Sequence, residues 1–381
     1  MPTSRRRFLA TLAAPAVGLL AAAPRLNVER VEFIPVTVPM KKGTAVSENY
    51  GKYLDIRLRD FDKYPHYLLK LYAGGGIVSL GETGREVPEA GVKANADFLQ
   101  GKDLRQLDFS KPSLGLPDAR TADGFEIAIY DAMGKALGVP VHTLLGGGQQ
   151  QKVAVSYWTG QRTEADLIEI GQRALAGGFH NLKFKARFGD PIDKQLAAVA
   201  KACPGLTFVV DFNSSYPDLA AFLPVAKRLE GFPVTIEDPV PKRLDWFRQL
   251  RQRTTIPYAL TPSGPEQLFE AIRQEACDVF NLGGDMRTFV KLGYAAQLAG
   301  IPAWHGSGVE MGVRDASFIH AAAATRSCTM GSDTLSYLRE HTLLTGNAMQ
   351  PREGYIEVPQ GPGLGVELDE DAVKRFRAGA R

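Results

Sequence analysis

The sequence predicts an α/β fold in which a parallel β-barrel follows a smaller α+β region. Three observations support this prediction. From Val153 onward, short apolar strands alternate with amphipathic helices, and this pattern requires a parallel sheet. Seven such strands with helical crossovers fit a closed barrel better than an open sheet. Before Val153, three strand-like segments are followed by two helical patterns.

Length and composition limit the class of protein. The 381 residues suggest two domains, or one large barrel with additions. Hydrophobic residues make up 44% and charged residues 23%, which is ordinary for a globular protein and excludes a disordered, collagenous or coiled-coil chain. The three cysteines are widely spaced and odd in number, so they predict neither a disulfide framework nor a zinc site.

The N-terminus is typical of an export signal over residues 1–23. Arg5, Arg6 and Arg7 precede a short apolar run that ends in small residues near Ala22 and Ala23. Adjacent arginines followed by Phe-Leu resemble a twin-arginine signal, which predicts a periplasmic protein; a buried helix is the alternative. The run is too short to span a bilayer. Cleavage removes three positive charges and changes the net charge from +3 to 0, which argues against a nucleic-acid-binding chain.

Residues 28–150 are expected to form an α+β domain, and a glycine-rich boundary follows Leu145. The charged stretch Met40–Tyr64 is interpreted as a long loop, either a lid over a site or a solvated insertion. The predicted strands are Val31–Val38, Tyr67–Tyr72 and Ile77–Gly81, and the predicted helices are Val87–Gln100 and Ala122–Leu137.

Residues 151–345 are expected to form the barrel, and residues 346–381 to pack back on the N-terminal domain. The predicted barrel strands are Val153–Tyr157, Asn181–Lys185, Thr207–Asp211, Thr235–Glu237, Tyr258–Leu260, Val279–Leu282 and Ala303–His305. The predicted helices between them are Glu164–Ala176, Ile192–Ala202, Leu219–Leu229, Leu244–Arg253, Pro265–Arg273 and Thr288–Ala299.

Polar side chains gather where these predicted strands end, and such ends form the functional face of a barrel. Steps of 28, 26 and 24 residues separate Lys183, Asp211, Glu237 and Thr261, about one strand and helix each, so these side chains can converge. The strand-end residues are Lys183, Lys185, Asp211, Asn213, Glu237, Thr261, Ser263 and His305.

Lys183 and Lys185 alternate within one strand and therefore face the same side, opposite Phe184. Mutual repulsion and desolvation in a barrel interior would lower the pKa of both lysines, which suits a lysine base. The alternative is a solvated pair on an exposed strand.

Asp211 and Glu237 are hard oxygen donors on successive strands and suit Mg²⁺, or they are ion-pair partners of the two lysines. Asn213 shares a face with Asp211, where it supports the metal or touches substrate. His305 ends its strand and is a candidate acid or base, with a structural role as the alternative.

Six short motifs, in this order and spacing, resemble the enolase superfamily, in its mandelate racemase and muconate-lactonising branch. The resemblance covers about residues 28–375. The motifs are Gly81-Glu82-Thr83, Ala128 to Lys135 with Leu144 to Gly147, Lys183-Phe184-Lys185, Asp211-Phe212-Asn213, Glu237-Asp238-Pro239 and Gly363 to Val366.

The resemblance implies a modified TIM barrel, (β/α)7β, with an α+β capping domain completed by the C-terminal tail. It implies a Mg²⁺ that holds a substrate carboxylate while a base removes the α-proton. Lys185 would be the base and Lys183 would assist with its charge. Asp211 and Glu237 would be metal ligands, and His305 lies where racemase-like members keep a histidine.

Two positions depart from this pattern. Thr261 replaces the third acidic or amide metal ligand, which removes one negative charge from the site. Gly283 stands where relatives carry a lysine or an aspartate, so a second base is missing and two-base racemisation is disfavoured.

The leading prediction is a Mg²⁺-dependent hydro-lyase that dehydrates a hydroxy or sugar acid. The alternatives are an epimerase or cycloisomerase of the same superfamily, and an exported binding protein without catalysis. The expected ligand is a small carboxylate, and relatives usually assemble as symmetric oligomers.

Overall fold

The computed structural model describes residues 25–45 and 64–379. The predicted export signal and residues 46–63 of the predicted Met40–Tyr64 loop lie outside this range. No helix in the described part of the chain is long and apolar enough to cross a membrane.

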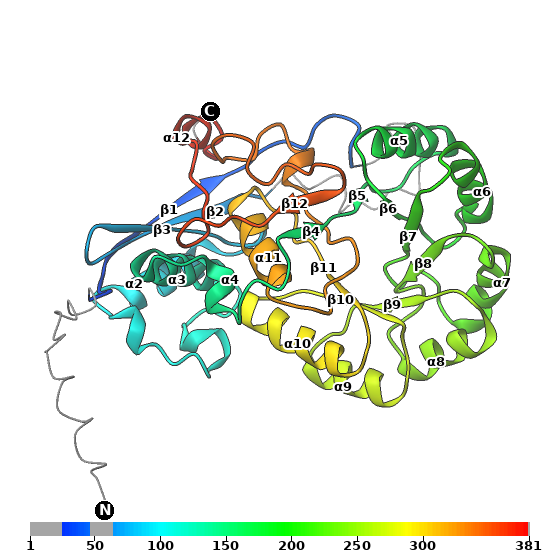
Figure 1. Ribbon diagram of the computed structural model, residues 1–381, viewed down its shortest axis with the longest axis horizontal. Coiled ribbons are helices and arrows are strands. Elements are labelled where there is room, and N and C mark those ends of the chain that lie inside the picture. The colour runs from blue at the N-terminus through cyan, green and yellow to red at the C-terminus, as the bar shows by residue number, and fades with distance from the viewer. Residues whose placement is uncertain (1–24, 46–63, 380–381) are drawn as a thin grey trace, which may run out of the picture.

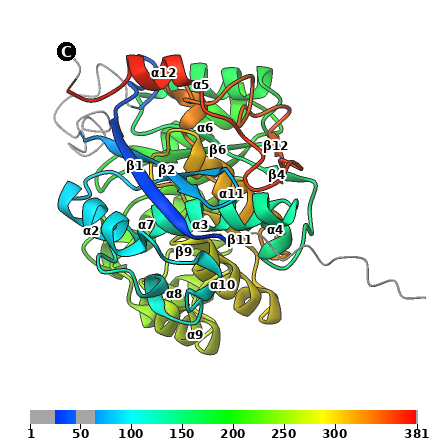
Figure 2. The ribbon, with the colours of Figure 1, turned by 90° about the vertical axis from the view of Figure 1, so that its left-hand side faces the viewer.

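The N-terminal part is an antiparallel sheet packed on helices (Figures 1 and 2). The sheet runs in the order β1 (Val28–Val36), β2 (His66–Ala73) and β3 (Ile77–Glu82). Side chains alternate along β2, so Leu69 and Leu71 share a core with α2 (Glu89–Leu99) and α3 (Ala122–Leu137), whereas Leu68 joins the core of the barrel.

Helix α3 lies directly against β3 because two glycines meet there. A Cβ atom on Gly81 would stand 2.3 Å from the carbonyl oxygen of Gly124, so a side chain would force the helix away. The short elements that follow the sheet are η2 (Leu104–Gln106), η3 (Pro112–Gly115) and α4 (Val141–Leu144).

Seven parallel strands form the curved sheet of the barrel, in chain order from one edge to the other. They are β5 (Tyr157–Trp158), β6 (Asn181–Lys185), β7 (Thr207–Asp211), β8 (Val234–Glu237), β9 (Tyr258–Leu260), β10 (Val279–Leu282) and β11 (Ala303–His305). Most are buried on both faces, as parallel strands covered by helices should be.

Seven helices cover the outside of this sheet, and α5 to α9 follow one another along its outer edge in Figure 1. They are α5 (Glu164–Ala176), α6 (Ile192–Ala202), α7 (Leu219–Leu229), α8 (Leu244–Arg253), α9 (Pro265–Arg273), α10 (Met286–Leu298) and α11 (Val313–Ala323). The predicted α/β barrel fold is confirmed. Helix α10 begins earlier than the predicted Thr288 because Asp285 accepts the Thr288 amide at 2.8 Å and caps the helix.

The predicted first barrel strand, Val153–Tyr157, is wrong as a single element. Its first half forms β4 (Lys152–Ala154), which pairs antiparallel with β12 (Tyr355–Glu357), and only β5 pairs with the barrel. In the sequence, the larger apolar residues Val153, Val155 and Tyr157 alternate with the small residues Ala154 and Ser156, so the local pattern shows no break. The partner of β4 lies about 200 residues later in the chain.

Residues 327–333 close the barrel between β11 and the segment before β5. The Ala303 amide donates to the Ser327 carbonyl at 2.7 Å, and the Ser156 amide donates to the Ser332 carbonyl at 3.0 Å. Isolated parallel bridges at Ala303–Cys328 and Val155–Ser332 mark the same contacts. This segment takes the place of the eighth strand, as the (β/α)7β expectation requires.

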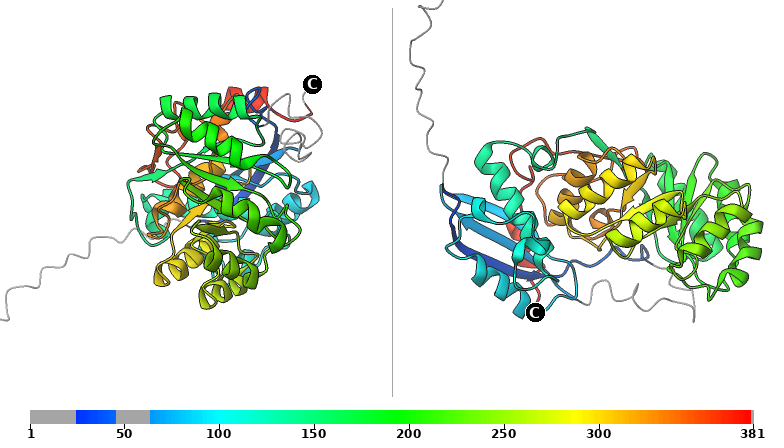
Figure 3. Two further views of the ribbon diagram at one scale, coloured as in Figure 1. Left: turned by 90° about the vertical axis from the view of Figure 1, so that its right-hand side faces the viewer. Right: turned by 90° about the horizontal axis from the view of Figure 1, so that it is seen from below.

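The C-terminal segment returns to the N-terminal part, and α12 (Glu370–Arg375) lies at its edge (Figures 2 and 3). The Thr37 amide donates to the Phe376 carbonyl at 2.9 Å, and the Leu364 amide donates to Asp131 Oδ1 at 2.7 Å. A Cβ atom on Gly134 would stand 2.7 Å from Gly363 Cα, so this contact with α3 needs a glycine. The remaining short element is η4 (Ser336–Leu338).

Candidate active site

A cavity of about 540 Å³ opens at the carboxyl ends of the barrel strands. Its floor carries Lys183, Lys185, Asp211 and Glu237, because parallel strands in register bring their ends to one mouth. Arg85, from the turn after β3, lines the opposite side. The cavity therefore lies between the barrel and the N-terminal part.

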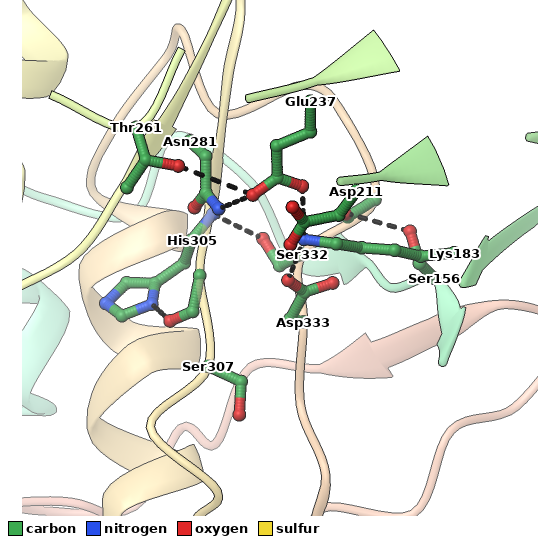
Figure 4. A network of polar contacts seen from close by, with 12 residues as sticks. Ser156, Lys183, Asp211, Glu237, Thr261, Asn281, His305, Ser307, Ser332 and Asp333 are labelled. Atoms are coloured by element: carbon green, nitrogen blue, oxygen red, sulfur yellow. Dashed lines mark hydrogen bonds and ion pairs between the residues drawn. The ribbon is translucent and has the colours of Figure 1, made fainter. Parts of the chain in front are cut away.

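Lys183 is held between two carboxylates in the barrel interior (Figure 4). Its Nζ lies 2.7 Å from Glu237 Oε2, 2.5 Å from Asp333 Oδ2 and 5.1 Å from the centre of the Trp304 ring. Burial opposes the charge of Lys183, but Asp333, Glu237 and Asp211 raise its pKa well above the ordinary value. The predicted fall in the pKa of Lys183 is therefore wrong, because the carboxylates outweigh repulsion and desolvation.

Lys185 faces the cavity from the same strand, and its side chain is 15% exposed. Its Nζ donates a short hydrogen bond to Asp211 Oδ2. Burial opposes the charge of Asp211, but Lys185 and Lys183 hold the pKa of this carboxyl below its usual range. Both lysines share one face, as predicted, and Phe184 lies in the apolar core.

Asn213 lines the cavity but uses its donors on Asp211. Its backbone amide lies 2.8 Å from Asp211 Oδ1, and its Nδ2 lies 3.0 Å from Asp211 Oδ2. Of the two roles expected for Asn213, the support of the carboxylate is the one with contacts in this structure.

Glu237 connects three strands. Its Oε1 accepts from Asn281 Nδ2 at 2.5 Å and from the Thr261 hydroxyl at 3.4 Å (Figure 4). Burial and the charge of Asp211 raise the pKa of Glu237 to about 7, against the opposing effect of Lys183. Thr261 thus lies beside Glu237, where the resemblance places the third metal ligand. Ser263 is hydrogen-bonded to Gln267 and does not line the cavity.

His305 does not line the cavity, although it ends β11 as predicted. Its ring is stacked between Phe318, with centroids 3.7 Å apart, and Phe289, at 4.4 Å. Nδ1 lies 2.7 Å from the Gly306 carbonyl, and burial lowers the pKa of His305 to about 3. The structural role is the one that fits, because a pKa this low leaves the imidazole neutral and its ring points away from Lys183 (Figure 4).

Several charged groups of the cavity are absent from the sequence prediction, among them Asp333, Lys242, Arg85 and Arg314. Asp333 follows the segment that closes the barrel and binds Lys183. Lys242 lines the cavity, with its Nζ 3.0 Å from Asp238 Oδ2 and 2.7 Å from the Thr261 carbonyl. Asp238 already stands in the Glu237-Asp238-Pro239 motif, so the sequence signals this carboxylate but not its partner Lys242. Nothing local in the sequence signals Asp333.

The fold and the strand-end carboxylates and lysines define a barrel enzyme with a cap over its catalytic face. The family model described as "Enolase C-terminal domain-like" matches residues 166–372. The chain belongs to the enolase superfamily, in its mandelate racemase and muconate-lactonising branch.

Three similar proteins illustrate the branch. Muconate cycloisomerase 1 of Rhodococcus opacus is 31% identical over 263 residues, 66% of this chain and 70% of that protein. N-succinylamino acid racemase of Thermus thermophilus is 32% identical over 337 residues, 81% and 88% of the two chains. The solved structure of N-succinyl Arg/Lys racemase from Bacillus cereus has a TM-score of 0.80 at 21% identity and covers 93% of this chain and 98% of its own.

Enzymes of this branch generally use a divalent metal, typically Mg²⁺. The donor set of this chain fits such a metal, with one carboxylate ligand fewer than the family pattern. Asp211 and Glu237 are paired in register on β7 and β8, and a cation between them would relieve the repulsion that raises the pKa of Glu237. Within the described ranges, no group of three or more His, Cys, Asp or Glu is placed to hold a metal ion. Two carboxylates would hold the cation, completed by neutral ligands such as the Thr261 hydroxyl.

Proposed function

We propose that this protein is an isomerase that removes the proton α to a substrate carboxylate and then breaks or forms a bond to a second carboxylate of the same molecule. The observation that carries the proposal is the difference between the two lysines. Lys183 is buried between two carboxylates, whereas Lys185 contacts one carboxylate among the residues that the structure describes, and it opens to the cavity. Lys185 is therefore the base, and Lys183 is a fixed positive charge.

The leaving group distinguishes this reaction from loss of water. Hydroxide is a poor leaving group that needs a proton, since the pKa of water is about 15.7. His305 was the expected acid, but its ring is buried outside the cavity, and no other histidine among the described residues lines it. A carboxylate, with a pKa of about 4, leaves without protonation. The structure thus favours opening or closing of a lactone over the dehydration of a hydroxy acid.

The proposed steps balance within one molecule. Lys185 first gives its own proton to solvent at the open cavity and then takes the α-proton as a neutral amine. The electron pair forms the double bond, and the bond from the β-carbon to the carboxylate oxygen breaks. Lys183 stabilises the negative charge that develops on the substrate carboxylate, and its contacts with Glu237 and Asp333 fix its position. A divalent cation on Asp211 and Glu237 would add to this stabilisation when bound.

The similar proteins also include racemases. To invert an α-carbon, the proton must be taken from one face and returned on the other, which calls for an acid–base group on each face. The sixth barrel strand, β10, carries Asn281, which is bonded to Glu237, and then Gly283, which has no side chain. Single-base chemistry on one face therefore fits this site better than racemisation, and it agrees with a cycloisomerase among the relatives.

Proton exchange in D₂O tests the proposal. Wild-type protein with Mg²⁺ is incubated with a panel of lactones and unsaturated dicarboxylic acids, and deuterium at the α-carbon is followed by NMR. We expect Lys185→Gln to slow exchange by about 10²- to 10⁴-fold, the usual contribution of a general base. Lys227→Gln, which removes a surface ammonium paired with Glu230, is the matched control. Exchange that survives in Lys185→Gln would exclude this lysine as the base. Specific binding without exchange in the wild type would instead support a non-catalytic binding protein.

We further propose that the protein is exported to the periplasm by a twin-arginine signal. The support is the basic start at Arg5, Arg6 and Arg7 and the apolar run that follows. Replacing Arg5, Arg6 and Arg7 with lysines should leave the protein in the cytoplasm, and cell fractionation measures this directly. Unchanged export of that variant would contradict a twin-arginine signal.

A further inference from the structure

Four polar side chains form one layer of the barrel interior at the floor of the cavity. They are Lys183 on β6, Glu237 on β8, Asn281 on β10 and Asp333 at the end of the closing segment, and each is at most 8% exposed. Alternate strands of a TIM barrel contribute the side chains of one layer, which explains why these four meet. Lys183 forms ion pairs with both carboxylates, so Asn281 is the uncharged member of the layer.

Asn281 fixes the rotation of the Glu237 carboxylate (Figure 4). Its Nδ2 donates to Glu237 Oε1 at 2.5 Å, whereas Glu237 Oε2 lies 2.7 Å from Lys183 Nζ. The Thr261 hydroxyl adds a longer contact to Oε1, at 3.4 Å. Hydrogen bonds to a carboxylate are about twice as strong as those between neutral groups. The amide of Asn281 therefore decides which oxygen of Glu237 faces Lys183 and which is turned away from it.

Gly306 makes room for the side chain of Asn281. A Cβ atom on Gly306 would stand 2.4 Å from Asn281 Oδ1, so any larger residue would displace this side chain. The Gly306 amide donates to the Leu282 carbonyl at 2.7 Å, which holds the backbone against β10. Gly306 does not have a left-handed φ, so the glycine is needed for space and not for backbone conformation. The orientation of Asn281 is thus built into two neighbouring strands.

We propose that Asn281 is a positioning residue that makes the site of Asp211 and Glu237 select Mg²⁺ over Ca²⁺. Because Asn281 occupies Oε1, Glu237 offers a cation at most one oxygen. Mg²⁺ keeps a near-octahedral shell with several waters, whereas Ca²⁺ takes about six to eight ligands and accepts both oxygens of one carboxylate. The inference rests on the proposed function only for the cation on these two carboxylates. It adds the residue that sets the choice of cation.

Calorimetric titration of the chelator-treated, full-length protein with MgCl₂ and with CaCl₂ tests the inference in the absence of substrate. The measured quantity is the Kd for Ca²⁺ divided by the Kd for Mg²⁺, and we expect it to exceed one in the wild type. Asn281→Leu keeps a similar volume but has no donor. It should lower the ratio by about tenfold, since a hydrogen bond to a charged group is worth at least that factor. A merely structural role would weaken both cations alike and leave the ratio unchanged.

Two further variants separate positioning from a folding defect. Gly306→Ala should displace Asn281 Oδ1 and lower the ratio although Asn281 itself is kept, and it carries the test if Asn281→Leu does not fold. Asn95→Leu is the matched control, because it removes a buried amide outside the cavity that donates to the Asp118 carbonyl at 2.8 Å and the Thr121 hydroxyl at 2.7 Å.

Three results would overturn the inference. The wild type binds neither cation or prefers Ca²⁺, or the ratio in Asn281→Leu and Gly306→Ala stays within about twofold of the wild type, or Asn95→Leu lowers the ratio equally.

The two proposals can fail separately, because the selection of the cation is measured without substrate and proton exchange is measured with it. A ratio that depends on Asn281 in a protein without proton exchange would refute the isomerase and retain this inference. Exchange that depends on Lys185 in a protein whose ratio is indifferent to Asn281 would do the reverse.

Discussion

Lys183 Nζ lies 2.5 Å from Asp333 Oδ2, and this contact joins strand β6 to the segment that closes the barrel. Both side chains are nearly inaccessible to water, at 2% and 4% exposure. The contact therefore acts on stability as well as on the position of the positive charge under the cavity.

Replacing this carboxylate should affect both properties. We expect Asp333→Asn to lower the free energy of unfolding by about 1–3 kcal/mol, because Lys183 keeps Glu237 but loses one charged partner. The turnover number should fall more than KM rises, because Lys183 acts on the negative charge that develops on the substrate during the reaction, and its ammonium would be displaced. Urea unfolding and steady-state kinetics measure the two effects. Asp193→Asn, at an exposed pair with Arg228, should change neither, and an inert Asp333→Asn would contradict the role given to Asp333.

The missing charge at Thr261 predicts a gain of metal affinity on substitution. Thr261→Asp would place a third carboxylate beside Glu237 Oε1, which accepts from the Thr261 hydroxyl at 3.4 Å. We expect tighter Mg²⁺ binding by calorimetry and a lower Tm without metal, because three carboxylates repel one another. Glu237→Gln should abolish the Mg²⁺-induced rise in Tm and serves as the control. Equal or weaker binding by Thr261→Asp would place this residue outside the metal site.

His305 is expected to be dispensable for proton exchange. Phenylalanine in its place can stack between Phe289 and Phe318, so His305→Phe should keep the exchange rate within about fivefold. Phenylalanine cannot bond to the Gly306 carbonyl as His305 does, so loss of that contact could move Gly306. His305→Gln can still donate this hydrogen bond and serves as the control for such a movement. If both variants lost activity by more than 10²-fold, a value typical of an acid–base group, the histidine would have to reach the substrate.

The ion pair between Glu126 and Arg287 predicts a pH dependence of stability. Burial raises the pKa of Glu126 to about 7, and the charge of Asp285 adds to this, against the opposing effect of Arg287. The folded state therefore binds the proton more tightly than the unfolded state, and this carboxyl makes stability fall as pH rises from about 4.5 to about 7.

Glu126→Gln should remove that dependence. Relative to the wild type, its free energy of unfolding should improve by an amount of the order of 3 kcal/mol as pH rises through this window. Urea titrations at several pH values measure it, with the exposed Glu357→Gln as the control. A difference from the wild type that does not change with pH would show that Glu126 does not titrate there.

The sequence is enough to predict the barrel and its floor, because both follow from local periodicity. Lys183, Lys185, Asp211 and Glu237 stand at strand ends one structural unit apart, and the fold brings them together. Ion pairs of Asp211 and Glu237 with the two lysines were one of the two expectations, and both pairs form. The second partner of Lys183, Asp333, could not be predicted, because it lies in a segment with only a few sheet hydrogen bonds. The orientation of His305 depends on two phenylalanines that are distant in sequence.

The hydrogen bonds between the two ends of the chain impose an order on folding. Strand β1 receives its outer contacts from residues 376–378, through the Thr37 amide and the Ala378 amide. During synthesis, β1 leaves the ribosome long before residues 376–378, which supply these contacts. The N-terminal sheet must therefore wait for those residues before its edge is covered, and a chain that stops before them would expose that edge to other molecules.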